Sequence, residues 1–259
     1  MKWLLSLLFA FTVWSSFSQA TSTKNSDYYQ IYVYHFKTAE QEAVLDNYLS
    51  KAYISAAKKF GIKQVGAFKP IANDTASDKL LVVVSTLSKL DQLVQLPAAL
   101  LANADYQKEG ATYINASHDN PPYNRMETII LKGFRLATKF QLPNLSNGVD
   151  KKIYELRSYE SPTEKYYRNK VEMFNEGGEI PLFKRLNFNA IFYGDVLAGS
   201  RMPNLMYMTS FESMEAREQH WKEFFDSPEW KALISNKYYE KNVSKVNIVL
   251  MKATAYSDY

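Results

Sequence analysis

The chain carries the same pattern twice, 125 residues apart. Tyr29 begins the segment YQIYVY, and Tyr154 begins YELRSY at the corresponding place. Features further along keep this offset, because LLVVVSTLSKL at 80–90 aligns with LMYMTSFESME at 205–215. The later segments METIILKGF and KVNIVLMKA also match, after a shorter connector in the second copy. Self-similarity at a fixed spacing indicates a repeated structural unit, so the chain is expected to fold as two related units.

Each unit reads as strand, helix, strand, strand, helix, strand. The first strand alternates, with Tyr29, Ile31 and Val33 on one face. The helix after it is expected to start with a capping box at Thr38 and to stop at Gly61. This order predicts the α+β ferredoxin-like unit, in which both helices cover one face of an antiparallel sheet.

The corresponding helix of the second unit is expected to begin in the segment SPTE. Ser161 would be its N-cap, and Pro162 would take the first helical position. Gly177 and Gly178 should interrupt this helix before IPLFKRL resumes it, because glycine disfavours the helix interior.

A ferredoxin-like unit leaves one sheet face uncovered. Two units can cover each other, sheet against sheet about 10 Å apart, which predicts two tandem ferredoxin-like (βαββαβ) repeats packed as a pseudo-symmetric α/β barrel. The alternative is two independent domains whose open faces pair with a second chain, so a homo-oligomer stays open. The expected boundaries are 21–134 for the first repeat, 135–153 for the linker and 154–259 for the second repeat.

Residues 1–20 differ from the rest of the chain. Lys2 precedes an apolar stretch from Trp3 to Trp14, and small residues lead up to Ala20. This pattern is typical of a secretory signal peptide and is too short for a comfortable bilayer span. The expectation is an exported protein, periplasmic or secreted, with no integral membrane segment after signal removal. The sequence contains no Cys, so no disulfide is expected.

Several functional classes are disfavoured by the sequence. The net charge of +4 is spread without a basic run, so no nucleic-acid partner is expected. The three histidines are scattered and show no metal-binding spacing, so no metal is expected. No cofactor is expected either, because YGDVLAGSR at 193–201 lacks the dinucleotide and phosphate-loop glycine spacings and is interpreted as a hairpin turn.

The segments YELRSY, NFNAIFYGDVLAG and LMYMTSFESMEAREQHWKEFFDSPEWKAL resemble the NIPSNAP family, whose domain is similar to the dimeric α/β-barrel type. The resemblance covers the chain after residue 20 and is strongest in the second repeat. In the first repeat, Gln30 and Tyr32 stand where the motif has an acid and an arginine. The resemblance implies a fold more than a reaction, because the family is better defined by its fold.

The charged strand of the second repeat supplies the first candidate site. Glu155, Arg157 and Tyr159 share one strand face, which is expected to turn away from the helices and into the barrel. Two interpretations stay open: Glu155 and Arg157 form a structural ion pair, or Arg157 holds a ligand anion or enolate. Arg125 and Glu127 form a similar pair, and the two pairs are expected to meet at the barrel centre.

His35, next to Tyr34 at the end of the first strand, is a candidate for the cleft mouth between the sheet and the helices. Histidine is the obvious proton acceptor near neutral pH, although an edge residue without function is the alternative. The sequence therefore predicts a small organic or apolar ligand in the barrel cleft. A cofactor-independent monooxygenase or isomerase, or a structural or protein-interaction barrel without ligand, are the alternatives. A pocket of roughly 300 Å³ or more would favour a ligand.

Overall fold

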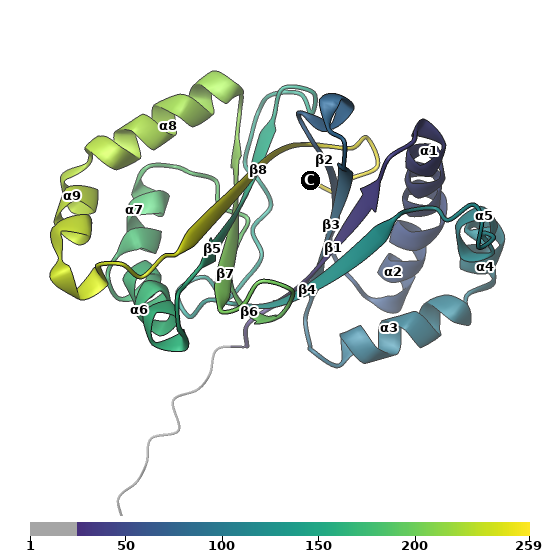
Figure 1. The fold of residues 1–259 in the computed structure, drawn as a ribbon, viewed down its shortest axis with the longest axis horizontal. Helices are drawn as coiled ribbons and strands as arrows, with labels where there is room; N and C mark the ends of the chain where they lie inside the picture. The colour runs from purple at the N-terminus through teal and green to yellow at the C-terminus, as the bar shows by residue number, and fades with distance from the viewer. Residues whose placement is uncertain (1–24) are drawn as a thin grey trace, which may run out of the picture.

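The computed structural model describes residues 25–259, and the expected signal peptide lies outside them. Within this range, strands close into an antiparallel barrel in the order β1-β3-β2-β8-β5-β7-β6-β4, with β4 returning to β1 (Figure 1). Each half contributes four adjacent strands, so the predicted barrel of two tandem βαββαβ units is confirmed. The strands are β1 (Tyr28–Phe36), β2 (Val65–Pro70), β3 (Lys79–Leu87), β4 (Arg125–Gly133), β5 (Ile153–Glu160), β6 (Phe192–Ala198), β7 (Asn204–Phe211) and β8 (Lys245–Ala253).

The helices lie outside the barrel, with those of the first half on one side and those of the second half on the other (Figure 1). No helix in residues 25–259 has the length and apolar character needed to cross a membrane. The helices are α1 (Ala39–Asn47), a π-helical segment (Tyr48–Tyr53), α2 (Ile54–Phe60), α3 (Gln92–Leu101), α4 (Ala104–Glu109), α5 (Ala111–Ile114), α6 (Glu164–Asn175), α7 (Glu179–Arg185), α8 (Met214–Asp226) and α9 (Pro228–Ser235), with 3₁₀ turns at Asn73–Thr75 and Lys237–Tyr239.

The helix ends follow the sequence signals with one exception. The capping box at Thr38 is present, and Gly178 adopts a left-handed φ of 95° between α6 and α7. The N-cap of α6 is Thr163, so the predictions of Ser161 as N-cap and of Pro162 at the first helical position were wrong. The Ser161 hydroxyl instead donates to the buried backbone carbonyl of Asn242 at 2.7 Å, which leaves the next hydroxyl to cap the helix.

Apolar side chains gather in three layers. The barrel core fills the inside of the barrel, and a helix layer lies between the sheet and the helices in each half. Tyr154 and Leu156 belong to the barrel core, together with Tyr29 and Ile31 of the first half. The residues between them on each strand therefore face the helices, which decides where the candidate site residues lie.

The C-terminal tail closes one end of the barrel. The ring of Tyr259 packs inside against Phe68 and Phe140, with centroids 5.2 Å away in both cases. Gly66 makes room for this ring, because a Cβ there would lie 2.7 Å from a Tyr259 carbon. The pocket described next lies at the other end.

Candidate functional site

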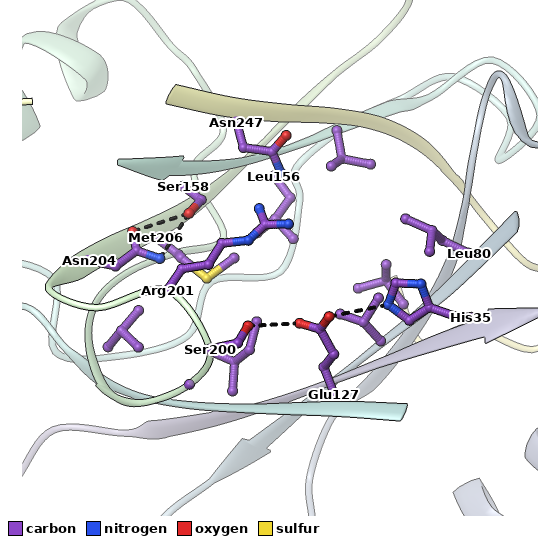
Figure 2. A pocket seen from close by; sticks show the side chains of 16 residues that line it. His35, Leu80, Glu127, Leu156, Ser158, Ser200, Arg201, Asn204, Met206 and Asn247 are labelled. Carbon is purple, nitrogen blue, oxygen red and sulfur yellow. Dashed lines mark hydrogen bonds and ion pairs between the residues drawn. The ribbon is translucent and has the colours of Figure 1, made fainter. Parts of the chain in front are cut away.

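The opposite end of the barrel contains a pocket, at the point where β1 and β5 finish (Figure 2). Its volume is about 80 Å³, which is below the roughly 300 Å³ that was expected to favour a ligand. A buried apolar cavity of about 150 Å³ can hold benzene, so this pocket accepts a smaller group or one that extends through the mouth. Its floor is aliphatic and includes Val33, Val82, Ile129, Leu156, Val196 and Val249.

His35 lies at the rim of this pocket, on the inner side of the sheet, and not between the sheet and the helices where a cleft was expected. Its Nδ1 is 2.8 Å from Oδ2 of Asp78, and its Nε2 is 3.4 Å from Oε1 of Glu127. Nε2 is buried and makes no hydrogen bond within the described part of the chain. With Nδ1–H donating to Asp78, the lone pair of Nε2 is free to accept a proton from a bound molecule.

Glu127 is held in place by neighbours on both sides. The Ser200 hydroxyl donates to its Oε2 at 3.0 Å, and a guanidinium nitrogen of Arg125 lies 2.8 Å from Oε1. Arg125 is exposed and does not line the pocket. The expected pair of Arg125 and Glu127 therefore forms, and it places only its carboxylate at the pocket.

The pocket wall opposite His35 is lined by polar side chains, none of which is a carboxylate. Ser158 and Asn204 hydrogen-bond each other, with the Asn204 amide nitrogen 2.9 Å from the Ser158 hydroxyl. Asn247 and Arg201 complete this side of the lining (Figure 2). None of these four residues was predicted from the sequence, although Arg201 lies in YGDVLAGSR. That segment is mostly strand β6, and only residues 199–203 form the turn.

The predicted face of the charged strand was wrong. Glu155 lies in the second helix layer, where it accepts hydrogen bonds from Nε of Arg217 at 2.7 Å and Nε1 of Trp221 at 3.0 Å. The expectation assigned Leu156 to the helices, because helices usually cover the apolar face. Here the barrel interior is the more apolar side, and α8 supplies the donors that a buried carboxylate needs.

Arg157 makes two side-chain hydrogen bonds and a stacking contact within the same layer. Its Nε donates to Glu155, a second nitrogen donates to the Tyr159 hydroxyl at 3.0 Å, and its guanidinium stacks 3.6 Å from the centroid of a Trp221 ring. These contacts favour the structural interpretation of the Glu155–Arg157 pair. The pair also lies on the other side of the barrel wall from Glu127, so the expected meeting of two ion pairs at the barrel centre does not occur.

The pKa of the Glu155 carboxyl is lowered. Burial acts to raise it, but the hydrogen bond from Arg217, the charge of Arg157 and the hydrogen bond from Trp221 outweigh burial. Glu155 is therefore an anion with the positive charges of two arginines beside it.

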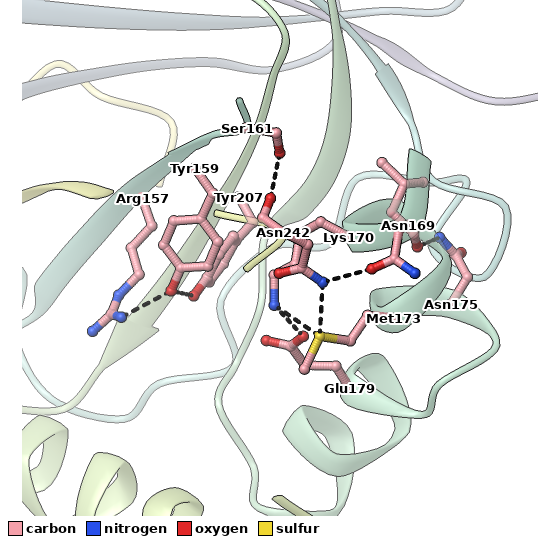
Figure 3. Close-up of polar contacts among 11 residues, drawn as sticks. Arg157, Tyr159, Ser161, Asn169, Lys170, Met173, Asn175, Glu179, Tyr207 and Asn242 are labelled. Carbon is pink, nitrogen blue, oxygen red and sulfur yellow. Dashed lines mark hydrogen bonds and ion pairs between the residues drawn. The ribbon is translucent and has the colours of Figure 1, made fainter. Parts of the chain in front are cut away.

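A second buried ion pair lies deeper in this layer (Figure 3). Lys170 Nζ is 2.9 Å from Oε2 of Glu179, and both side chains are almost completely buried. Burial raises the pKa of the Glu179 carboxyl, and the charge of Lys170 offsets this only in part. Nearby, the hydroxyls of Tyr159 and Tyr207 are 2.8 Å apart. The Lys170–Glu179 ion pair was not predicted from the sequence, since neither of its residues lies in a recognisable motif.

Tyr34 does not reach the pocket. It faces the first helix layer, where its ring lies 5.5 Å from that of Tyr123 and 6.4 Å from that of Tyr113. Tyr34 and His35 are adjacent in a strand and point to opposite faces, so only one of them can line the barrel.

Within residues 25–259, no three His, Asp or Glu side chains are grouped so that they could hold a metal ion.

The NIPSNAP family model matches residues 154–258. The second half of the chain is therefore similar to the NIPSNAP family. The matched NIPSNAP segment starts on β5 and includes the buried network of Glu155, Arg157 and Trp221. No curated protein sequence matches the chain.

Three solved structures are similar to this protein over nearly its whole length. A candidate monooxygenase from Fusobacterium nucleatum is 9% identical and has a TM-score of 0.54, with 89% of this chain and 93% of that chain covered. A candidate monooxygenase from Lactobacillus acidophilus is 10% identical, with a TM-score of 0.55 and coverage of 88% and 94%. An anthrone oxidase-like protein is 9% identical, with a TM-score of 0.52 and coverage of 90% and 93%. At these identities the similarity concerns the fold alone.

Proposed function

We propose that this protein binds a small organic compound in the pocket at the barrel mouth. The observation that carries the proposal is the buried Nε2 of His35, which lines an open pocket and makes no hydrogen bond within residues 25–259. The Glu127 carboxylate lies 3.4 Å from this atom but makes no hydrogen bond to it. A buried polar atom without a hydrogen bond is costly, and a bound molecule at this place would supply one. The aliphatic floor would hold the carbon part of the compound.

The pocket depends on both halves of the chain. His35 and Glu127 come from the first half, whereas Ser158 and Asn204 come from the second. This arrangement supports a site that exists only when the barrel is closed. A barrel filled completely by side chains, which would suit a purely structural role, would leave no such pocket.

The geometry of His35 favours a second candidate function, acid–base catalysis without a cofactor. Nε2 would take a proton from a C–H or O–H group of the bound compound, and Asp78 would stabilise the imidazolium through Nδ1–H. Glu127, 3.4 Å from Nε2, would add to this stabilisation. Isomerisation and cofactor-independent oxygenation can both begin with such a proton removal, and either would use the same pocket.

Native mass spectrometry of the protein purified from its own host tests ligand binding. The wild-type protein is expected to retain a small molecule, and His35→Gln is expected to lose it. His118→Gln is the matched control, because that histidine is fully exposed in a loop. A wild-type protein without any retained compound, or retention that is equal in His35→Gln, would contradict the proposal.

Export is a separate proposal, which rests on residues 1–20 of the sequence. Intact-mass analysis of the mature protein should place Thr21 first. A mature chain that still contains Trp3 would contradict export with signal removal.

A further inference from the structure

We infer that the compound bound at the barrel mouth is a small aliphatic monocarboxylate, whose carboxylate is held by Arg201 while its carbon end faces His35. This inference rests on the proposed function, because it names the chemical class of the ligand for the same pocket. It comes from the distribution of charge and of unused hydrogen-bond donors around the lining.

The charges around the pocket are separated into two sides. Both carboxylates stand on the His35 side: Asp78 contacts the His35 ring, and Glu127 is paired with Arg125. Arg201 lines the opposite side and has no ion pair or hydrogen bond to another residue of the range 25–259. An anionic ligand would therefore be attracted to Arg201 and repelled by Glu127, which fixes the direction in which it binds.

Neutral donors stand close to this cation in the lining. The Asn247 side chain makes no hydrogen bond to the rest of residues 25–259, so its amide is available to a ligand. Figure 2 shows the Arg201 side chain extending across the pocket, with its guanidinium on the side of Leu156 and Asn247. A planar guanidinium matches the two oxygens of a carboxylate, and a neighbouring amide can donate to either oxygen.

The turn that carries Arg201 is anchored to the barrel wall. The Ser200 hydroxyl donates to Glu127 at 3.0 Å, and a Cβ on Gly199 would lie 3.3 Å from a methyl carbon of Ile129. These contacts hold the segment 199–203 against β4. They distinguish Arg201 from an arginine on a free surface loop, although its side chain is accessible to a ligand that arrives from solvent.

The size of the pocket limits the carbon end. A volume of about 80 Å³ with an aliphatic floor suits a chain of a few carbons rather than an aromatic ring. Propionate is therefore a suitable probe, and propionamide is its neutral counterpart of nearly the same shape.

The test is a titration of the full-length protein at pH 7, followed through the ring signals of its histidines by NMR. The chain has three histidines, so His35→Gln assigns the relevant signal. Propionate is expected to shift the His35 signal saturably and to bind at least about tenfold more tightly than propionamide. Arg201→Gln should weaken propionate about tenfold or more and leave propionamide unchanged. Arg185→Gln is the control, because that arginine pairs with Glu229 on the surface.

The outcomes separate the two proposals. If propionamide binds as tightly as propionate and Arg201→Gln changes neither, the anion inference is wrong while the pocket remains a binding site. If sodium chloride at the same ionic strength produces the same shift, the effect is charge screening, and the inference is also overturned. If no probe, charged or neutral, shifts the His35 signal, both the inference and the proposed small-ligand site fail.

Discussion

The two halves of the molecule share one topology but fill their helix layers with different chemistry. In the second half, Glu155 and Arg157 face α8 and are paired there. The corresponding strand positions of the first half are Gln30 and Tyr32, and no charged side chain of residues 25–134 is buried. The tyrosines of the first helix layer are Tyr28, Tyr32, Tyr34, Tyr48, Tyr53, Tyr106, Tyr113, Tyr123 and Tyr256.

The difference extends to the helix that covers the strand. Arg217 and Trp221 of α8 donate to Glu155, whereas Gln92 and Leu96 of α3 occupy the corresponding positions in the first half. The carboxylate and its donors are thus all present in one half and all replaced in the other. The first half thus closes its share of the barrel without the charged network, and we expect a buried carboxylate to be stable only where its donors are present.

The largest effect is expected for Glu155→Gln. The carboxylate is completely buried and offsets the charge of Arg157, so its loss leaves a buried cation without a partner. The free energy of unfolding should fall by about 3–5 kcal/mol, measured by urea denaturation. Gln30→Leu in the first half is the matched control and should change stability far less. Similar losses for both variants would contradict the contrast between the halves.

A carboxylate placed alone in the first half should also be costly. Gln30→Glu puts a charge at a buried position where Gln92 and Leu96 replace the donors of α8. We expect a loss of about 2–3 kcal/mol at pH 7. This loss of stability should become smaller as the pH falls. Burial raises the pKa of the introduced carboxyl, so its neutral form becomes dominant. Unchanged stability at pH 7 would show that the first layer tolerates charge.

The natural carboxylate should have the opposite pH dependence. Because the pKa of Glu155 is lowered in the folded protein, its contribution is complete above the unfolded pKa of about 4.3 and is lost as the pH falls through the folded pKa. The unfolding free energy of the wild type should therefore drop more steeply below pH 5 than that of Glu155→Gln. Parallel pH profiles for the two proteins would rule out a lowered pKa for this group.

The smallest effect concerns the first helix layer. The Tyr48 and Tyr106 hydroxyls are 3.0 Å apart and buried, so Tyr48→Phe should cost about 1 kcal/mol. Tyr159→Phe in the second half should cost about 1.5–3 kcal/mol, because the lost hydroxyl accepts from a guanidinium. Thermal unfolding of the two variants compares them directly, and the reverse order would count against the charged layer being the stronger one.

The sequence was informative about topology and less so about side-chain direction. The repeat and its strand periodicity predicted the barrel, because both depend on spacing along the chain. Periodicity also predicted that Glu155 and Arg157 share a face, but not which face, since both sides of this strand are buried. His35 could be placed at the mouth because it ends a strand. Arg201 could not be placed from the sequence, because its position depends on how the turn 199–203 lies against β4 of the other half.

We propose that the functional pocket lies between the halves at the barrel mouth, and not in the charged layer of the segment that matches the family model. A crystal structure of the protein grown with propionate tests this most directly. We expect density for the acid between Arg201 and His35, with its carboxylate at Arg201. Density for the acid beside Arg157 in the second helix layer, with the barrel mouth holding only water, would contradict the account.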